Sequence, residues 1–184
     1  MSTGSVLSPD GFEFVYQNIK SDIQLASISG GTDICGCFIA AVPILPIYSG
    51  EIQGACLGMA IDVLDDDGNS LPVDLKGELV CLKAFPSMPI GFWGDERNSN
   101  FKQSYFSKFE GVWTHGDFAS KTINSGFIIH GRSDATLNAK GVRIGTAEIY
   151  RVVEGLAEIQ ECLAVAQEFE NDSRVILFVT LRPG

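Results

Sequence analysis

The chain has 184 residues, a hydrophobic content of 45% and a formal net charge of −10. That hydrophobic content is sufficient for a folded core and excludes an intrinsically disordered chain. The negative charge argues against a nucleic-acid partner, because nucleic-acid-binding surfaces use basic side chains to replace phosphate counterions.

The cysteine and apolar patterns indicate a cytosolic protein. The 5 cysteines form no CxxC pair and no metal-type quartet, which favours reduced thiols over a disulfide framework. Residues 1–14 lack the basic and apolar regions of a secretory signal. The longest apolar run, residues 35–46, is interrupted by glycine and proline and is too short to cross a bilayer. We therefore expect no membrane insertion.

The first part of the chain is predicted to contain one helix and one strand. Ser8 can cap a helix over residues 8–20, with Pro9 in the first turn, where proline is tolerated. Its apolar face would hold Phe12, Val15, Tyr16 and Ile19. Residues 23–28 suit a buried strand that ends in the Ser-Gly-Gly-Thr-Asp sequence of residues 29–33. Two adjacent glycines favour a tight turn and a close ligand approach, although a plain turn also fits.

Residues 51–109 have short β-type runs separated by glycine, proline and aspartate. Residues 60–64, 77–82 and 105–109 are predicted to be strands, with a turn at residues 65–69. The acidic turn does not fit a calcium loop, because aligning Gly68 with the loop glycine puts Val63 at the first ligand position. A solvated hairpin is the better interpretation.

Residues 111–117, Gly-Val-Trp-Thr-His-Gly-Asp, contain two candidate functional side chains. His115 would be a catalytic base or a bystander, and the bystander is favoured because no serine or cysteine nucleophile motif accompanies it. Asp117 follows a glycine, as turn residues often do.

Residues 131–150 read GRSDATLNAKGVRIGTAEIY and have the pattern of a hinge. A polar turn at residues 131–134 precedes a short alternating segment at 136–144 and a helix that opens at Thr146. Thr146 can cap this helix, and Glu148 places a carboxylate in its first turn. The apolar face is predicted to hold Ile149, Val152, Val153 and Leu156. Residues 175–181 suit a core strand.

These motifs resemble those of the adenylate-forming enzymes, which include acyl-CoA synthetases, peptide-synthetase adenylation domains and firefly luciferase. Residues 131–150 resemble the Gly-Arg-x-Asp…Gly-x-Arg-Ile…Glu-Ile core of that superfamily, and residues 76–80 with 91–93 resemble a segment of its distorted β-barrel. Residues 27–33, 50–53, 105–109 and 113–117 narrow the resemblance to the branch that activates acetoacetate. The resemblance covers nearly the whole chain.

The resemblance implies a nucleotide site. Thr32 would contact an ATP phosphate, and Asp33, one methylene shorter than the usual glutamate, would hold Mg²⁺. Asp117 would accept hydrogen bonds from both ribose hydroxyls, with Arg132 as its partner at the sugar. The remaining nucleotide-binding positions implied by the resemblance are Gly4, Ser5, Gly30 and Gly31.

The resemblance also implies a two-step reaction. The acid attacks the α-phosphate of ATP to give an acyl-adenylate and pyrophosphate, and the CoA thiol then displaces AMP. Thr32, Asp33 and Arg143 would stabilise the phosphoryl charge of the first step. A small domain would rotate about the hinge acid Asp134 for the second. There Gly141 would let CoA approach, and Lys140 would neutralise a CoA phosphate or be a solvated hairpin residue.

We expect a mixed α/β and α+β fold in three parts. These are the end of an α/β nucleotide-binding domain (1–50), a small distorted β-barrel (51–132), and, after a hinge, the start of a small α+β domain (133–184). The phosphate loop of the family would precede residue 1 and its adenylation lysine would follow Gly184, so we expect an inactive central part of a longer ligase. Its partners would be acetoacetate, ATP and CoA. The alternatives are a truncated, non-catalytic isoform and a synthetase for another short acid such as acetate.

Overall fold

The structure is a computed structural model that describes residues 1–134, 137–139, 142–169 and 172–183. The chain divides into two compact units, unit 1 (Met1–Ile129) and unit 2 (His130–Gly184), and each is described here by itself. In the described residues no helix is long and apolar enough to span a membrane.

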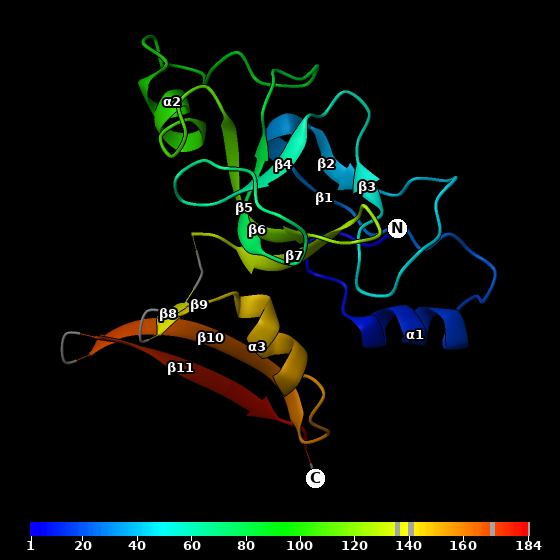
Figure 1. Ribbon diagram of the computed structural model, residues 1–184. Coiled ribbons are helices and arrows are strands. Elements are labelled where there is room, and N and C mark those ends of the chain that lie inside the picture. The colour runs from blue at the N-terminus through cyan, green and yellow to red at the C-terminus, as the bar shows by residue number, and fades with distance from the viewer. Residues whose placement is uncertain (135–136, 140–141, 170–171, 184) are drawn as a thin grey trace. The chain divides into compact units, whose positions relative to one another are not determined.

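Unit 1 is built on two antiparallel sheets (Figure 1). The first contains β1 (Ser29–Gly31), β2 (Gly36–Ala40) and β3 (Gly54–Ala55) in that order. The second has the order β4-β5-β6-β7 and consists of β4 (Ile61–Leu64), β5 (Lys76–Cys81), β6 (Trp113–Lys121) and β7 (Phe127–Arg132), the last of which runs on into unit 2. Over the residues that the structure describes, these sheets do not close into a barrel.

The strands predicted at 60–64 and 77–82 are confirmed to within one residue. β5 is one of the two inner strands of its sheet and pairs with β4 on one side and β6 on the other. All of its residues from Gly77 to Cys81 are buried, and the one charged side chain among them, that of Glu78, is paired with Lys108.

Two predicted strands are wrong. Residues 23–28 form no strand, and Ser27 makes only an isolated parallel bridge to Ser2. Of the apolar residues there only Leu25 is buried, and β1 begins directly after the segment, at Ser29. Residues 105–109 are also not a strand, because Tyr105 ends the helix α2 (Ser99–Tyr105) and bends follow it.

Helix α2 forms because its N-terminus is capped and one of its faces is aromatic. The Asp95 carboxylate accepts hydrogen bonds from the backbone N–H groups of Ser99 (3.0 Å) and Phe101 (2.9 Å). These bonds, led by the one from Phe101, lower the pKa of Asp95. Phe101 and Tyr105, four residues apart, are both buried against β6. In the sequence, the four-residue spacing of Phe101 and Tyr105, together with the upstream Asp95, is the pattern that indicates this helix.

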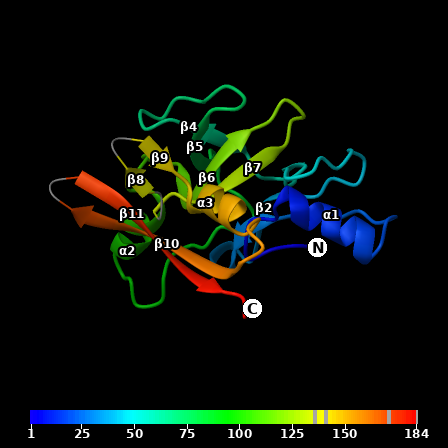
Figure 2. The same ribbon diagram turned by 90° about the horizontal axis from the view of Figure 1, so that it is seen from below.

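Helix α1 (Pro9–Asn18) confirms the predicted N-terminal helix. The Ser8 hydroxyl accepts a hydrogen bond from the Gly11 N–H at 3.2 Å, as the capping prediction required. Phe12 is buried, whereas Ile19 lies just outside the helix and is 67% exposed. Helices α1 and α2 lie at opposite ends of unit 1 in both views of the ribbon (Figures 1 and 2).

The core of unit 1 is centred on Trp113, which is 1% exposed. Phe85 packs edge-on against both Trp113 (centroids 5.4 Å apart) and Phe38 (5.6 Å). Edge-to-face aromatic pairs add about 0.5–1.5 kcal/mol to the burial of their area. Further buried members are Ile34, Ile39, Val63, Leu79, Phe101 and Tyr105. Residues of both sheets and of α2 therefore share one core.

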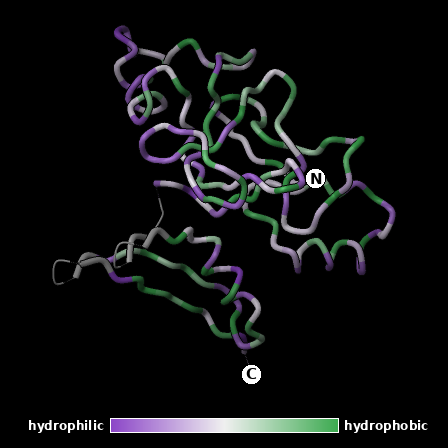
Figure 3. The backbone as a smooth tube through the Cα atoms, in the orientation of Figure 1, coloured by the Kyte–Doolittle hydropathy of each residue, from purple (hydrophilic) through white to green (hydrophobic). Residues whose placement is uncertain are grey.

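Unit 2 consists of α3 (Thr146–Val153), β8 (Leu137–Ala139), β9 (Val142–Ile144), β10 (Ile159–Phe169) and β11 (Asp172–Leu181). β10 and β11 form a two-stranded antiparallel ribbon, and both strands are largely apolar (Figure 3). Such a ribbon is marginal alone, and α3 packs against β10. In that contact, the Tyr150 hydroxyl accepts the Ala164 N–H at 3.3 Å.

The helix and strand predicted in unit 2 are confirmed, with different details. Gly145 rather than Thr146 is the N-cap, and the Glu148 carboxylate accepts the Gly145 N–H at 3.0 Å. Helix α3 ends at Val153, before Leu156, and Val152 is 72% exposed, so the predicted apolar face is only partly buried.

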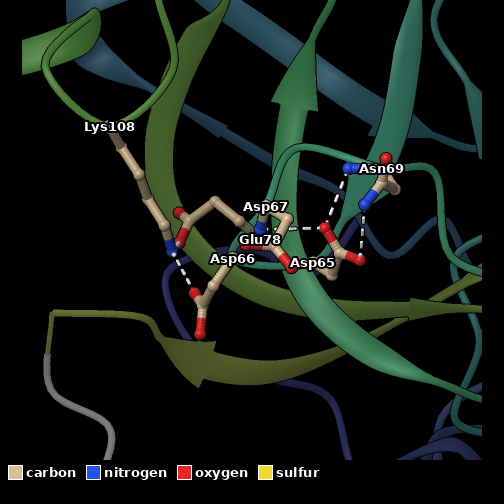
Figure 4. A network of polar contacts seen from close by, with 6 residues as sticks. All are labelled: Asp65, Asp66, Asp67, Asn69, Glu78 and Lys108. Atoms are coloured by element: carbon tan, nitrogen blue, oxygen red, sulfur yellow. Dashed lines mark hydrogen bonds and ion pairs between the residues drawn. The ribbon is translucent and has the colours of Figure 1, made fainter.

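A lysine fixes the loop between α2 and β6 (Figure 4). The turn predicted at 65–69 is present, and the Asp65 carboxylate accepts the N–H groups of Asp67 (3.0 Å) and Asn69 (2.8 Å). Lys108 Nζ lies 2.9 Å from the Glu78 carboxylate on β5 and 3.3 Å from that of Asp66. The Glu78 side chain is only 2% exposed, so this ion pair joins the loop to the sheet beneath it.

Replacing Lys108 by methionine should lower the free energy of unfolding by about 3 kcal/mol, because Glu78 would remain buried without the Lys108 charge. Urea denaturation followed by tryptophan fluorescence measures the change. Asp66→Asn is the matched control, since it removes an exposed partner of the same lysine and should cost less than about 1 kcal/mol. Equal losses in the two variants would contradict this account of Glu78.

Candidate functional site

Two segments far apart in the sequence meet on unit 1. The Ser29 hydroxyl, at the start of β1, donates a hydrogen bond to Asp117 Oδ2 on β6 at 3.2 Å. Asp117 is 7% exposed. The 3₁₀-helix η1 (Thr32–Ile34) follows β1 directly, and Thr32 and Asp33 are exposed on it. The structure thus joins Asp117 to Ser29, the residue directly before the Gly-Gly-Thr-Asp sequence.

Asp33 is held by a tyrosine that the sequence analysis did not assign to the site. The Tyr105 hydroxyl donates a hydrogen bond of 2.6 Å to Asp33 Oδ2. The Tyr105 ring stacks on Trp113, with centroids 3.8 Å apart and an interplanar angle of 12°. Burial, and then the hydrogen bond to Asp33, raise the pKa of Tyr105 to about 12. The phenol therefore stays protonated and donates at neutral pH.

His115 lies against the motif rather than apart from it. Trp113 Nε1 donates to His115 Nδ1 at 3.4 Å, and the imidazole packs edge-on against Phe38 with centroids 5.1 Å apart. A Cβ atom placed on Gly31 would lie 2.5 Å from His115 Nε2. His115, for which the bystander interpretation is favoured, therefore packs directly beside Gly31.

The two glycines serve close packing and not a tight turn. Gly31 has an extended backbone, with φ −163°, and both glycines lie in β1. A Cβ atom on Gly30 would collide with the β2 backbone at Gly36 and Cys37. The left-handed residue of this region is instead Cys35, with φ +49°, which ends η1. The predicted turn at the glycines is therefore wrong, and the reason for the glycines is space.

The N-terminal candidates lie on unit 1 and are exposed. Gly4 has φ +88°, a left-handed value that favours glycine, and apart from its two chain neighbours no residue lies within 4 Å of a Cβ placed there. Ser5 follows it. Ser2, two residues before Gly4, bridges to Ser27, two residues before Ser29. The N-terminal segment therefore runs beside the residues that lead into β1.

The hinge candidates lie on unit 2. Arg132 Nε and Nη2 donate to the two carboxylate oxygens of Asp134, at 3.2 and 3.1 Å. Both side chains are exposed, 47% and 67% respectively. Arg143 lies on β9 opposite Asn138, but its side chain is outside the described part of the structure. Lys140 and Gly141 also lie outside the described residues.

A divalent cation at Asp33 would need ligands from outside the described side chains. The described residues contain no group of three or more histidine, cysteine, aspartate or glutamate side chains that could hold a metal ion. Mg²⁺ commonly binds one or two carboxylates and takes its other ligands from water and substrate phosphates. The exposed carboxylate of Asp33 fits this way of binding Mg²⁺.

The fold is that of part of an acid-CoA ligase. The chain superposes with a TM-score of 0.75 on a benzoate CoA ligase from Burkholderia xenovorans, with 19% identity, covering 97% of this chain and 34% of the ligase. At that identity the likeness establishes the fold alone. No family model matches the sequence.

Closer relatives specify the group. An acetoacetyl-coenzyme A synthetase from Rhizobium meliloti is 57% identical over 183 residues, which is 100% of this chain and 28% of the relative. The structure of the acetoacetyl-CoA synthetase from Streptomyces lividans superposes with a TM-score of 0.86 and 45% identity, over 98% of this chain and 27% of that one. The chain is thus a homologue of a segment of the acetoacetyl-CoA synthetases. It spans somewhat more than a quarter of their length.

Alanine at Gly31 should cost about 1–3 kcal/mol of stability, because its methyl group would overlap His115. In the His115→Ala background the same substitution should cost less than about 0.5 kcal/mol, since the overlap is gone. Urea denaturation of the two single variants and the double variant measures the coupling. Gly30→Ala is the control, because its methyl group meets the backbone of β2 and His115→Ala should not relieve it. Additive losses at Gly31 and His115 would exclude the contact.

The Tyr105 hydroxyl should make stability depend on pH in alkali. Its pKa is raised from 10.0 to about 12, so its contribution is complete below pH 10 and is lost as the pH rises towards 12. That shift corresponds to about 2–3 kcal/mol, at about 1.4 kcal/mol per pH unit. Between pH 10 and 12 the wild type should therefore lose more stability than Tyr105→Phe by this amount. Parallel curves for the two proteins in urea denaturation would show that the phenol is not the cause.

Proposed function

We propose that this chain forms part of the nucleotide site of a ligase that converts acetoacetate, ATP and CoA into acetoacetyl-CoA, AMP and pyrophosphate. The observation that carries the proposal is the 57% identity to an acetoacetyl-CoA synthetase over the whole chain. The hydrogen bond between Ser29 and Asp117 supports it, because it joins the two segments that the nucleotide would contact.

On the phosphate side, the working groups would be Thr32 and Asp33. Both side chains are exposed on η1, where a hydroxyl donor and a carboxylate can reach a phosphate group and its cation. Mg²⁺ bound at Asp33 would neutralise phosphate charge. Gly30 and Gly31 would contribute through their close packing, which fixes the backbone directly before Thr32.

On the ribose side, Asp117 would accept hydrogen bonds from the sugar hydroxyls. Its burial in β6 and the bond from Ser29 fix the position of the carboxylate before the nucleotide binds. Gly4 and Ser5 would lie near the adenine, as the course of the N-terminal segment beside residues 26–28 allows.

Unit 2 would supply the hinge and the CoA side. Asp134 would be the pivot, and Arg132 would exchange Asp134 for the nucleotide sugar, since an exposed ion pair contributes at most about 1 kcal/mol. Arg143 would stabilise phosphoryl charge in the first step. Gly141 and Lys140 would meet CoA in the second.

We further infer the three-part organisation expected from the sequence. Residues 1–50 would close a nucleotide-binding domain, 51–132 would contribute to a distorted barrel, and 133–184 would begin a mobile domain. The sheet β4-β5-β6-β7 supports the second part, as its linear order allows further strands to complete a barrel. The enzyme would act in the cytosol.

A hybrid enzyme tests the function. In the Rhizobium meliloti synthetase, the segment matched by this chain is replaced by residues 1–184, and CoA-ester formation is assayed with acetoacetate, acetate and butyrate. We expect turnover of acetoacetate with kcat/KM at least tenfold above that for the other acids. Asp117→Ala in the hybrid should reduce kcat/KM for ATP at least tenfold, the loss expected when a charged hydrogen-bond partner is removed. Residues 1–184 alone should release no pyrophosphate.

The control is Asp22→Ala, which removes an exposed carboxylate next to Lys20, outside the proposed site, and should leave kcat/KM unchanged. A folded hybrid that is inactive with all three acids would support a non-catalytic chain. A preference for acetate would assign the ligase to another short acid.

A further inference from the structure

The hydroxyl of Tyr105 makes a contact that the packing of its ring does not need. A phenylalanine could stack on Trp113 equally well, and the ring is also edge-on to Phe92 and Phe101, with centroids 5.9 and 5.7 Å apart. The hydroxyl instead reaches out of this aromatic group to Asp33, an exposed carboxylate, at 2.6 Å. Its partner is therefore a surface group of the candidate site and not a group of the core.

The same aromatic group touches the motif on both sides of Thr32. Trp113 stacks on Tyr105, which holds Asp33, and it donates to His115, which lies against Gly31. Trp113 is thus linked through His115 to the residue before Thr32 and through Tyr105 to the residue after it. This arrangement suits a segment whose hydroxyl and carboxylate must keep a fixed spacing.

We propose that Tyr105 is a positioning residue for Asp33, whose Oδ2 it occupies so that Oδ1 remains for the cation on the ATP phosphates. The inference rests on the proposed function. An exposed aspartate samples several rotamers, and a hydrogen bond from a buried phenol selects one of them before the ligand binds. Asp33 has a shorter reach than glutamate, so its productive positions are fewer and the anchor matters more.

The first test needs no ligand. Three-bond NMR couplings of the Asp33 side chain in the 184-residue chain report its χ1 rotamers. We expect one dominant rotamer in the wild type and averaged couplings in Tyr105→Phe, which keeps the stacked ring. Tyr48→Phe, at a tyrosine that is 42% exposed, is the matched control and should leave the couplings unchanged. Averaged couplings already present in the wild type would overturn the proposal.

The second test uses the hybrid enzyme. Tyr105→Phe should lower kcat/KM for ATP about tenfold and raise the Mg²⁺ concentration for half-maximal rate, with KM for acetoacetate unchanged. In the Asp33→Asn background it should change kcat/KM less than twofold, because the positioned group is gone. A merely structural tyrosine would lower all parameters together, or add its full loss to that of Asp33→Asn, and either result overturns the role.

The two proposals fail differently. A hybrid that turns over acetoacetate but is indifferent to Tyr105→Phe overturns only the positioning role. A folded hybrid without activity towards any of the acids overturns the proposed function, and the positioning role is lost with it.

Discussion

The stacking of Tyr105 on Trp113 is the interaction on which the rest of unit 1 depends. Trp113 is almost fully enclosed, and its ring contacts groups from α2 and β6 in one core. Dense packing of this kind transmits a displacement rather than absorbing it. The Tyr105 hydroxyl binds Asp33, and Trp113 Nε1 binds His115. The packing of these two rings in the core therefore sets the position of the exposed residues around Thr32.

The local elements of this fold were largely predictable from the sequence. Ser8 and the spacing of Phe12 determine α1 through capping and amphipathicity, which act within a few residues. β5 ends in the apolar residues Leu79, Val80 and Cys81, and α3 has Glu148 in its first turn, and both follow from short-range patterns in the same way. Residues 23–28 show the limit of this reasoning, since a short apolar run can bury one side chain, here Leu25, without pairing as a strand.

The contacts that build the site could not be derived from periodicity. Asp33 and Tyr105 are 72 residues apart, and Ser29 and Asp117 are 88 apart. Resemblance to a family supplied Thr32, Asp33 and Asp117, but it could not supply Tyr105, whose role exists only through a distance. The glycines illustrate the same point. Sequence reasoning attributed them to a turn because glycine tolerates positive φ, whereas the space beside them is taken by β2 and His115.

The two groups of candidate residues are held with different strength. Asp117 is buried in a central strand with a hydrogen bond from Ser29, and to move it would disturb the sheet. Arg132 and Asp134 form a bidentate pair in solvent, where breaking the pair costs little because water replaces each hydrogen bond. Under the proposed function this contrast would be useful, because Asp117 would be a fixed group on the nucleotide, whereas Arg132 and Asp134 would be the exchangeable groups at the pivot.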